Sequence, residues 1–188
     1  MMSEKVWVQS IIPAIEKGLK KKYKGIFIQE AFKLPYAYEV KSYTGDEPEE
    51  KINTKFETDV LIGEYNDNGT WIPRVIIEAK LESVTTHDAI TYSQKAMAHK
   101  NVHPYLRYGI IVGKILNIPG RLIRHGQNFD FMLAVEDYKP SPARLNAIVK
   151  LLLEEVEASR NLENMIYDSR SKAKAELMVL HRPLVVGK

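Results

Sequence analysis

The feature that most constrains the fold is a pair of apolar segments, residues 56–65 and 71–81, joined by a short polar turn. Each segment has the length of a β-strand and ends at turn-forming residues. The turn contains Asp67, Asn68 and Gly69, which suit a tight hairpin connection. The two segments are therefore predicted to pair as an antiparallel hairpin.

The second strand of this hairpin places two charges inside an apolar run, RVIIEAKLE at residues 74–82. Side chains of a strand alternate between its two faces, so Ile76, Glu78 and Lys80 share one face. The opposite face is predicted to pack in the core and carries Val75, Ile77 and Ala79. Burying opposite charges costs free energy unless they are paired, hydrated or bound to a ligand.

The partner strand carries an aspartate, Asp59, near the open end of the hairpin and within reach of Glu78. Two adjacent carboxylates repel each other unless a cation lies between them. Mg²⁺ suits such a pair because it binds one or two carboxylates together with water and phosphate oxygens. The Ala79 carbonyl could add a further oxygen ligand. Lys80 would then be placed to orient or deprotonate an attacking water.

This pattern resembles the PD-(D/E)xK nuclease superfamily, which includes many restriction endonucleases and Holliday-junction resolvases. The matching residues are Thr58-Asp59 and Glu78-Ala79-Lys80, with the two acids 19 positions apart, and Thr58 stands where the family has a proline. The resemblance covers roughly residues 4–138. It implies that Asp59 and Glu78 bind Mg²⁺, with Mn²⁺ able to substitute. It also implies that Lys80 orients or deprotonates the attacking water.

The resemblance also implies further site residues on neighbouring elements. Many members of the family place another acid on the first helix or first strand, where Glu16 and Glu30 are the candidates and Glu30 is preferred. Some members use a glutamine or lysine on the helix that follows the strand carrying the site lysine. Gln94 is the better match there, with Tyr92 and Lys95 beside it.

Basic side chains are concentrated in two short stretches. The formal charge of +3 and the pI near 8.9 permit a polyanionic partner without requiring one. A lysine run is most often a solvated helix face, but in a nuclease it would contact phosphates. Residues 120–126 lie between two strands, either as a DNA-reading segment or as an exposed hairpin. The candidate DNA contacts are Lys20, Lys21, Lys22, Lys95, Arg121 and Arg124.

The order of predicted elements indicates an α/β fold with a restriction-endonuclease-like mixed β-sheet flanked by helices on both faces. Helices are predicted at 4–22, 85–101 and 142–168, and strands at 25–34, 56–65, 71–81, 106–113 and 129–138. Residues 41–55 are predicted to form a flexible acidic loop. The length fits one domain, residues 1–188. Leu151 and Leu153 lie off the main apolar stripe of helix 142–168, which makes that helix a candidate dimerisation element.

The predicted function is that of a Mg²⁺-dependent DNA endonuclease, a type II restriction endonuclease or a related restriction or repair nuclease, acting as a homodimer. The chain has no cysteine, no signal-like N-terminal segment and no apolar stretch of the roughly 20 residues that span a bilayer, which favours the cytoplasm and no membrane. Two alternatives stay open. One is a DNA-binding module, or a subunit of a larger complex, that keeps the nuclease fold without cleaving. The other is a plain ion pair between Glu78 and Lys80.

Overall fold

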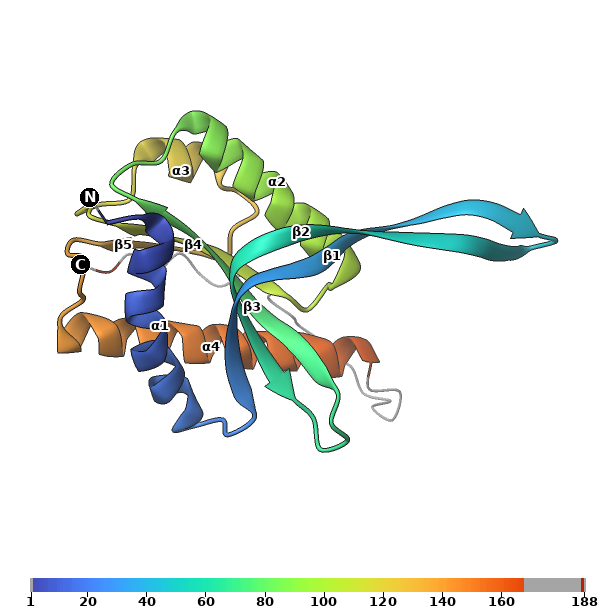
Figure 1. Ribbon diagram of the computed structural model, residues 1–188, viewed down its shortest axis with the longest axis horizontal. Coiled ribbons are helices and arrows are strands. Elements are labelled where there is room, and N and C mark those ends of the chain that lie inside the picture. The colour runs from blue at the N-terminus through green and yellow to red at the C-terminus, as the bar shows by residue number, and fades with distance from the viewer. Residues whose placement is uncertain (1, 168–186, 188) are drawn as a thin grey trace, which may run out of the picture.

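The computed structural model describes residues 2–167 and Gly187, and its centre is one five-stranded sheet (Figure 1). The strands lie in chain order and are β1 (Ile26–Thr44), β2 (Glu47–Tyr65), β3 (Trp71–Leu81), β4 (Arg107–Gly113) and β5 (Phe131–Val135). Strand β2 is antiparallel to β1 and β3, whereas β3, β4 and β5 are mutually parallel. The predicted α/β class with a mixed sheet is confirmed.

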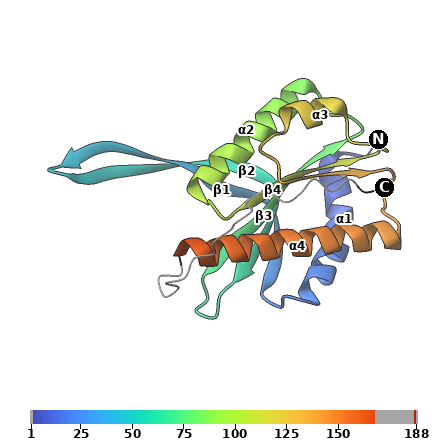
Figure 2. The ribbon, with the colours of Figure 1, turned by 180° about the vertical axis from the view of Figure 1, so that it is seen from behind.

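Helices cover both faces of this sheet, as predicted (Figures 1 and 2). One face is covered by α1 (Glu4–Lys20) and α4 (Pro142–Tyr167), and the other by α2 (Thr86–Val102) and the short α3 (Gly120–His125). The core beneath α1 and α4 includes Val75, Ile77 and Ala79, so the predicted inward face of β3 is confirmed. The opposite face of β3 contributes Ile76 to a second core cluster with Ala96 of α2.

The hairpin between β2 and β3 forms where the sequence predicts it. Tyr65 pairs with Trp71, and Gly69 adopts a left-handed φ of 81° in the connecting turn. The Asn68 side chain accepts a hydrogen bond from the Thr70 backbone N–H at 3.0 Å, which stabilises the turn locally. Local sequence chemistry is therefore sufficient to position this hairpin.

The prediction of a flexible loop over residues 41–55 is wrong, because β1 and β2 continue through it as a two-stranded ribbon that stands away from the body (Figures 1 and 2). The ribbon closes at Gly45 and Asp46. Gly45, the first of these two turn residues, has a φ of 61°, which a β-branched or bulky residue would rarely adopt. The alternation of Tyr36, Tyr38 and Val40 before this turn is the strand signal that the acidic composition obscured.

One other element differs from its prediction. Residues 120–125 form the helix α3 rather than an exposed hairpin, and its Leu122 is buried under α2. In α4, Leu151 and Leu153 are partly buried and pack against the same core as the fully buried Leu152. Asp168, the last residue of the predicted helix 142–168, lies outside the described residues. No helix within residues 2–167 has both the length and the apolar composition needed to cross a membrane.

Candidate active site

The candidate site lies where the pairing between β2 and β3 ends and the two strands diverge. Their last paired residues are Val60 and Ile77, after which β2 continues into the ribbon with β1, while β3 continues beside β4. At this branch point, the exposed Asp59 carboxylate accepts a hydrogen bond from the Ala79 backbone N–H at 2.8 Å. Because the N–H and C=O of a strand residue point to the same side, the Ala79 carbonyl also points toward this edge.

Glu78, the neighbour of Ala79, is almost completely buried, with 1% of its surface exposed. Its Oε1 accepts hydrogen bonds from the Tyr108 hydroxyl of β4 and from the Lys95 ammonium of α2, the latter at 2.9 Å. Burial raises the pKa of Glu78, and the nearby charge of Asp59 raises it further, while Lys95 and Tyr108 act in the opposite direction. The two predicted acids are therefore close enough to interact electrostatically.

Lys80 lies on the same face of β3, but its ammonium contacts different carboxylates. It is 3.6 Å from Glu4 of α1 and 3.6 Å from Asp88 of α2, and it lies 5.3 Å from the centre of the Tyr92 ring. Partial burial would lower the pKa of Lys80, but Tyr92, Glu4 and Asp88 outweigh this effect and raise it. These contacts favour the protonated form of Lys80, which can donate to an oxygen or neutralise its charge.

Helix α2 delivers Lys95 to the site rather than Gln94. Lys95 bonds Glu78, and its ammonium also donates to the Glu57 carbonyl at 3.1 Å, whereas the Gln94 side chain is exposed. The rotation of α2 about its axis follows from its buried residues Ala96 and His99, which direct Tyr92 and Lys95 toward the sheet. The role predicted for Lys95, a DNA contact, is compatible with this position.

The other predicted acids lie away from the pair. Glu30 pairs with Val60, whose side chain packs in the core on the α1 side, so Glu30 is directed to the opposite face from Asp59. Glu16 forms an ion pair with Lys20 at 2.8 Å on the surface of α1. In residues 2–167, no group of three or more Asp, Glu or His side chains is arranged to hold a metal ion.

The predicted DNA contacts are divided between distant places. Glu4 places the beginning of α1 at the site, and Lys20 follows 16 residues later, about 24 Å along the helix. Lys20, Lys21 and Lys22 therefore lie at the far end of α1 and do not border the site. Arg121 and Arg124 are exposed on α3, which packs against α2.

Three residues that the sequence did not indicate complete the surroundings, Glu4, Asp88 and Tyr108, together with Tyr92, which was expected beside Gln94 and Lys95. Asp88 has a second function, because it forms a reciprocal capping box with Thr85 at the start of α2. Tyr92 and Lys95 are three positions apart on a helix, a spacing that could have identified them as neighbours. Nothing in the sequence identified Tyr108 or Glu4.

His99 of α2 packs against the ring of Tyr108. Its ring stacks on Tyr108 with the two centres 5.8 Å apart, and Nδ1 lies 3.1 Å from the Pro35 carbonyl. Since that oxygen can only accept, Nδ1 carries the proton of the neutral ring. Nε2 is buried without a hydrogen-bond partner in the described part of the chain. Burial, together with the charges of Lys95 and His103, lowers the pKa of His99 to about 4, although the hydrogen bond to the Pro35 carbonyl acts in the opposite direction.

The pKa of His99 makes stability dependent on pH. Between its usual pKa of 6.5 and the folded value of about 4, the unfolded chain binds a proton that the folded protein does not. The free energy of unfolding should therefore rise with pH across this range, by up to about 3 kcal/mol. Urea titrations should show this slope in the wild type and in His125→Gln, a substitution of an exposed histidine, and a flatter one in His99→Gln. Equal slopes in all three proteins would contradict the assignment.

No protein-family model matches this chain, and no curated protein sequence matches it. The function must therefore be argued from the side chains of the site. The central observation is that Asp59 bonds the backbone beside Glu78 at a strand branch point and acts electrostatically on it. The Lys95 ammonium of α2 bonds Glu78, and Lys80 lies farther along the same face of β3.

Proposed function

We propose that this protein is a Mg²⁺-dependent endonuclease that hydrolyses phosphodiester bonds in DNA. The observation that carries the proposal is that Asp59 accepts a hydrogen bond from the backbone N–H next to Glu78 at the branch point of β2 and β3, close enough for its charge to raise the pKa of Glu78. Lys80 and Lys95 place two positive charges beside this pair, where a phosphate could be held.

The donors at the branch point fit a magnesium ion. Mg²⁺ usually binds one or two carboxylates and completes its coordination with water and substrate phosphates, so a third acid is not required. Asp59, Glu78 and the Ala79 carbonyl would hold the ion, and Mn²⁺ would be accepted by the same oxygens. When bound, such an ion polarises a phosphate and lowers the pKa of a bound water.

The protein side chains would have distinct roles. Lys80 stays protonated, so it would donate to a phosphate oxygen or to the water and neutralise the charge that develops during attack. Lys95 already neutralises Glu78 and would be free to contact a phosphate once another cation balances that carboxylate. Tyr108 would keep the Glu78 side chain in place through its hydroxyl.

The order of elements supports a restriction-endonuclease-like fold. The resemblance implies a helix, a strand, an acidic hairpin, a second helix and another strand, and the chain has α1, β1, the β2–β3 hairpin, α2 and β4 in this order. Both predicted acids and the lysine lie on the hairpin, as the resemblance implies. A type II restriction enzyme or a related restriction or repair nuclease would share these features.

The test is cleavage of supercoiled plasmid in buffer with Mg²⁺, Mn²⁺ or EDTA. The wild type is expected to nick the plasmid with either metal but not in EDTA, and Asp59→Asn should reduce nicking to background. Asp67→Asn is the matched control, because Asp67 is an exposed aspartate in the β2–β3 turn. Absence of metal-dependent nicking by the wild type, or equal nicking by Asp59→Asn, would refute the proposal.

A second candidate is a DNA-binding module, or a subunit of a larger complex, that does not cleave. The observation in its favour is that the charges at the site already have partners: Glu78 bonds Lys95 and Tyr108, and Lys80 lies near Glu4 and Asp88. A module of this kind would bind DNA equally well in EDTA and would release no heat when titrated with Mn²⁺.

A further inference from the structure

The two-stranded ribbon formed by residues 37–54, called the arm below, extends away from the body with nothing beside it among the described residues (Figures 1 and 2). It begins after the register shift between Pro35 and Ala37, and its strands pair from Ala37–Thr54 to Thr44–Glu47. At about 3.3 Å per residue, it is roughly 25 Å long. An isolated two-stranded ribbon is only marginally stable in water, so a partner that covers the arm would stabilise it.

The arm exposes large apolar side chains along its length. Tyr38, Val40, Tyr43 and Ile52 are between 41% and 65% exposed. Single exposed apolar residues are normal on a protein surface, but four on one narrow ribbon suit a protein interface. By the strand register, Tyr38 and Val40 share one face of the ribbon, and Tyr43 and Ile52 share the other.

The end of the arm is acidic. Residues 42–50 contain four acidic residues and no basic one. This charge opposes contact with the phosphates of a nucleic acid and favours a basic protein surface.

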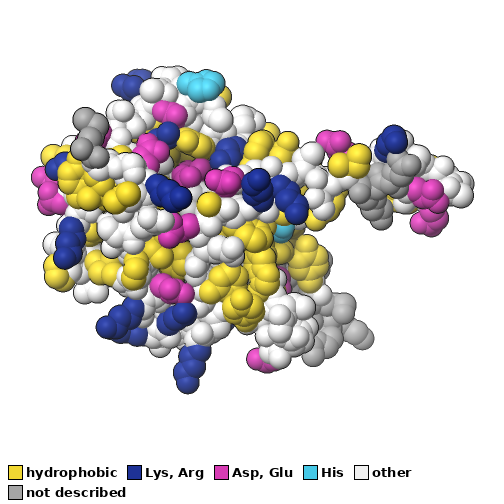
Figure 3. All heavy atoms as spheres, viewed as in Figure 1, with side chains coloured by type: hydrophobic (Ala, Val, Ile, Leu, Met, Phe, Trp, Pro, Cys, Tyr) yellow, Lys and Arg dark blue, Asp and Glu magenta, His cyan; other side chains and the backbone are white. Residues whose placement is uncertain are grey.

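A surface of that kind lies at the far end of α1. Residues 17–24 contain five lysines and no acid, and Lys17, Lys21 and Lys24 are exposed. Figure 3 shows basic side chains at the lower end of the body, where α1 ends in Figure 1, and acidic side chains toward the end of the arm.

Beside these lysines, an open groove of about 600 Å³ runs along α4. Its apolar part is formed by Val149, Leu153 and Ala158, and Lys22 and Lys150 lie at its edge. Two acids, Glu154 and Glu157, also line the groove, and Glu157 is bonded to Tyr23 and lies 3.6 Å from the Lys22 ammonium. The groove thus combines apolar surface with two lysines and two acids, and the excess of positive charge lies outside it, on the exposed Lys17, Lys21 and Lys24 at the end of α1. The apolar surface and these lysines complement the apolar side chains and the acidic end of the arm.

We propose that the arm of one copy of this protein docks along the α1–α4 groove of a second copy, and that the second arm does so reciprocally. The acidic end of each arm would face Lys17, Lys21 and Lys24 of the other copy, while apolar side chains of the arm cover the groove. A reciprocal contact of this type closes as a two-fold dimer, because both copies contribute the same two surfaces. The proposal does not depend on the nuclease function.

Charge reversal on the two surfaces tests the proposal directly. The arm variant is Asp46→Lys, Glu47→Lys and Glu49→Lys, and the groove variant is Lys17→Glu, Lys21→Glu and Lys24→Glu. By sedimentation velocity, the wild type should be a dimer, and each variant alone should associate on the order of 100-fold more weakly, because like charges then face each other. An equimolar mixture of the two variants should recover the dimer, because both contacts in the mixed pair again join opposite charges.

The controls separate docking from misfolding and from DNA binding. Arg121→Glu with Arg124→Glu reverses exposed charges on α3 and should leave the dimer unchanged. Circular dichroism establishes that every variant is folded, and native mass spectrometry identifies the mixed pair by its mass. A wild type that is monomeric at high micromolar concentration overturns the proposal, and so does a mixture that stays monomeric.

Discussion

Glu78→Gln is expected to reduce metal-dependent plasmid nicking by at least about a thousand-fold, with little change in the free energy of unfolding. The amide keeps the shape of the side chain but removes the negative charge that would hold the metal. A bound metal ion supplies several kcal/mol of transition-state stabilisation, and each 1.4 kcal/mol is a factor of ten in rate. The effect on stability should be small, because the amide oxygen can still accept the hydrogen bonds of Lys95 and Tyr108 and because burial already disfavours the charged form of Glu78.

The measurement compares nicking rates and urea denaturation for the wild type, Glu78→Gln and Glu136→Gln. Glu136 is an exposed glutamate just beyond β5, so its substitution should change neither quantity. If Glu78 only forms an ion pair with Lys95, the result is reversed: Glu78→Gln changes stability, and the wild type has no nicking activity to lose.

The raised pKa of Glu78 also gives a direction for the effect of pH. A carboxyl group with a raised pKa in the folded protein binds a proton there at a pH where the unfolded chain has released it, so its contribution to stability falls as pH rises through that pKa. Nicking has the opposite trend, because the carboxylate must be ionised to hold a metal. The acid limb of the activity profile should therefore lie above 4.5, the usual pKa of a glutamate.

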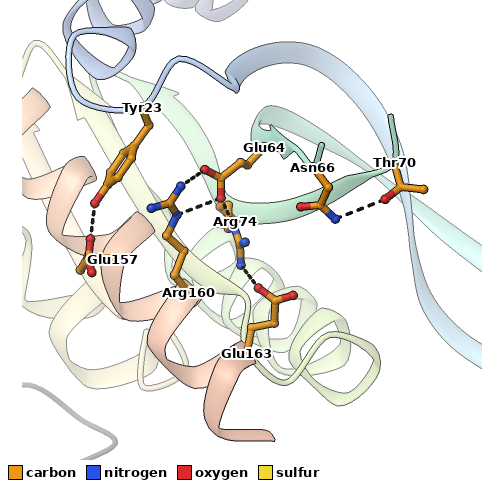
Figure 4. A network of polar contacts seen from close by, with 8 residues as sticks. All are labelled: Tyr23, Glu64, Asn66, Thr70, Arg74, Glu157, Arg160 and Glu163. Carbon is orange, nitrogen blue, oxygen red and sulfur yellow. Dashed lines mark hydrogen bonds and ion pairs between the residues drawn. The ribbon is translucent and has the colours of Figure 1, made fainter. Parts of the chain in front are cut away.

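Arg74→Met is expected to destabilise the protein by about 3–5 kcal/mol, the typical cost of breaking one half of a buried ion pair. Arg74 joins three elements: its Nε donates to Glu64 of β2 at 2.8 Å, and its Nη1 donates to Glu163 of α4 at 2.7 Å (Figure 4). Only 5% of its side chain is exposed. Arg160 of α4 also bonds Glu64, so the cluster fastens α4 to the β2–β3 hairpin (Figure 4).

The reason for the large effect is the buried charge that would remain. Burial alone would raise the pKa of Glu64, but Arg160 and Arg74 outweigh it and hold the pKa below its usual value. Without Arg74, that carboxylate keeps only Arg160. Adding Glu64→Gln to Arg74→Met should therefore restore part of the lost stability, measured as the midpoint of urea unfolding. Lys20→Met is the control, because its pair with Glu16 is exposed and is worth less than about 1 kcal/mol. If Arg74→Met also lost less than about 1 kcal/mol, the ion-pair cluster would have to be hydrated rather than buried.

The arm was missed in the sequence because composition and pattern disagreed over residues 41–55. Acidic and turn-forming residues in that stretch indicate a loop, and only the short alternation of Tyr36, Tyr38 and Val40 indicates a strand. This stretch becomes a strand because it pairs with β1. Each pair in the ribbon joins residues on opposite sides of the Gly45 turn.

The sequence by itself determined the β2–β3 hairpin and the approach of Asp59 to Glu78, because alternation and turn chemistry act over a few neighbouring residues. Only the tertiary structure decided which cation meets which acid. Lys95 reaches Glu78, and Lys80 lies between Glu4 and Asp88, because the packing of α1 and α2 on the sheet sets the direction of each side chain. That packing depends on contacts between residues far apart in the chain, such as the Tyr108 hydroxyl on Glu78, which no local pattern encodes.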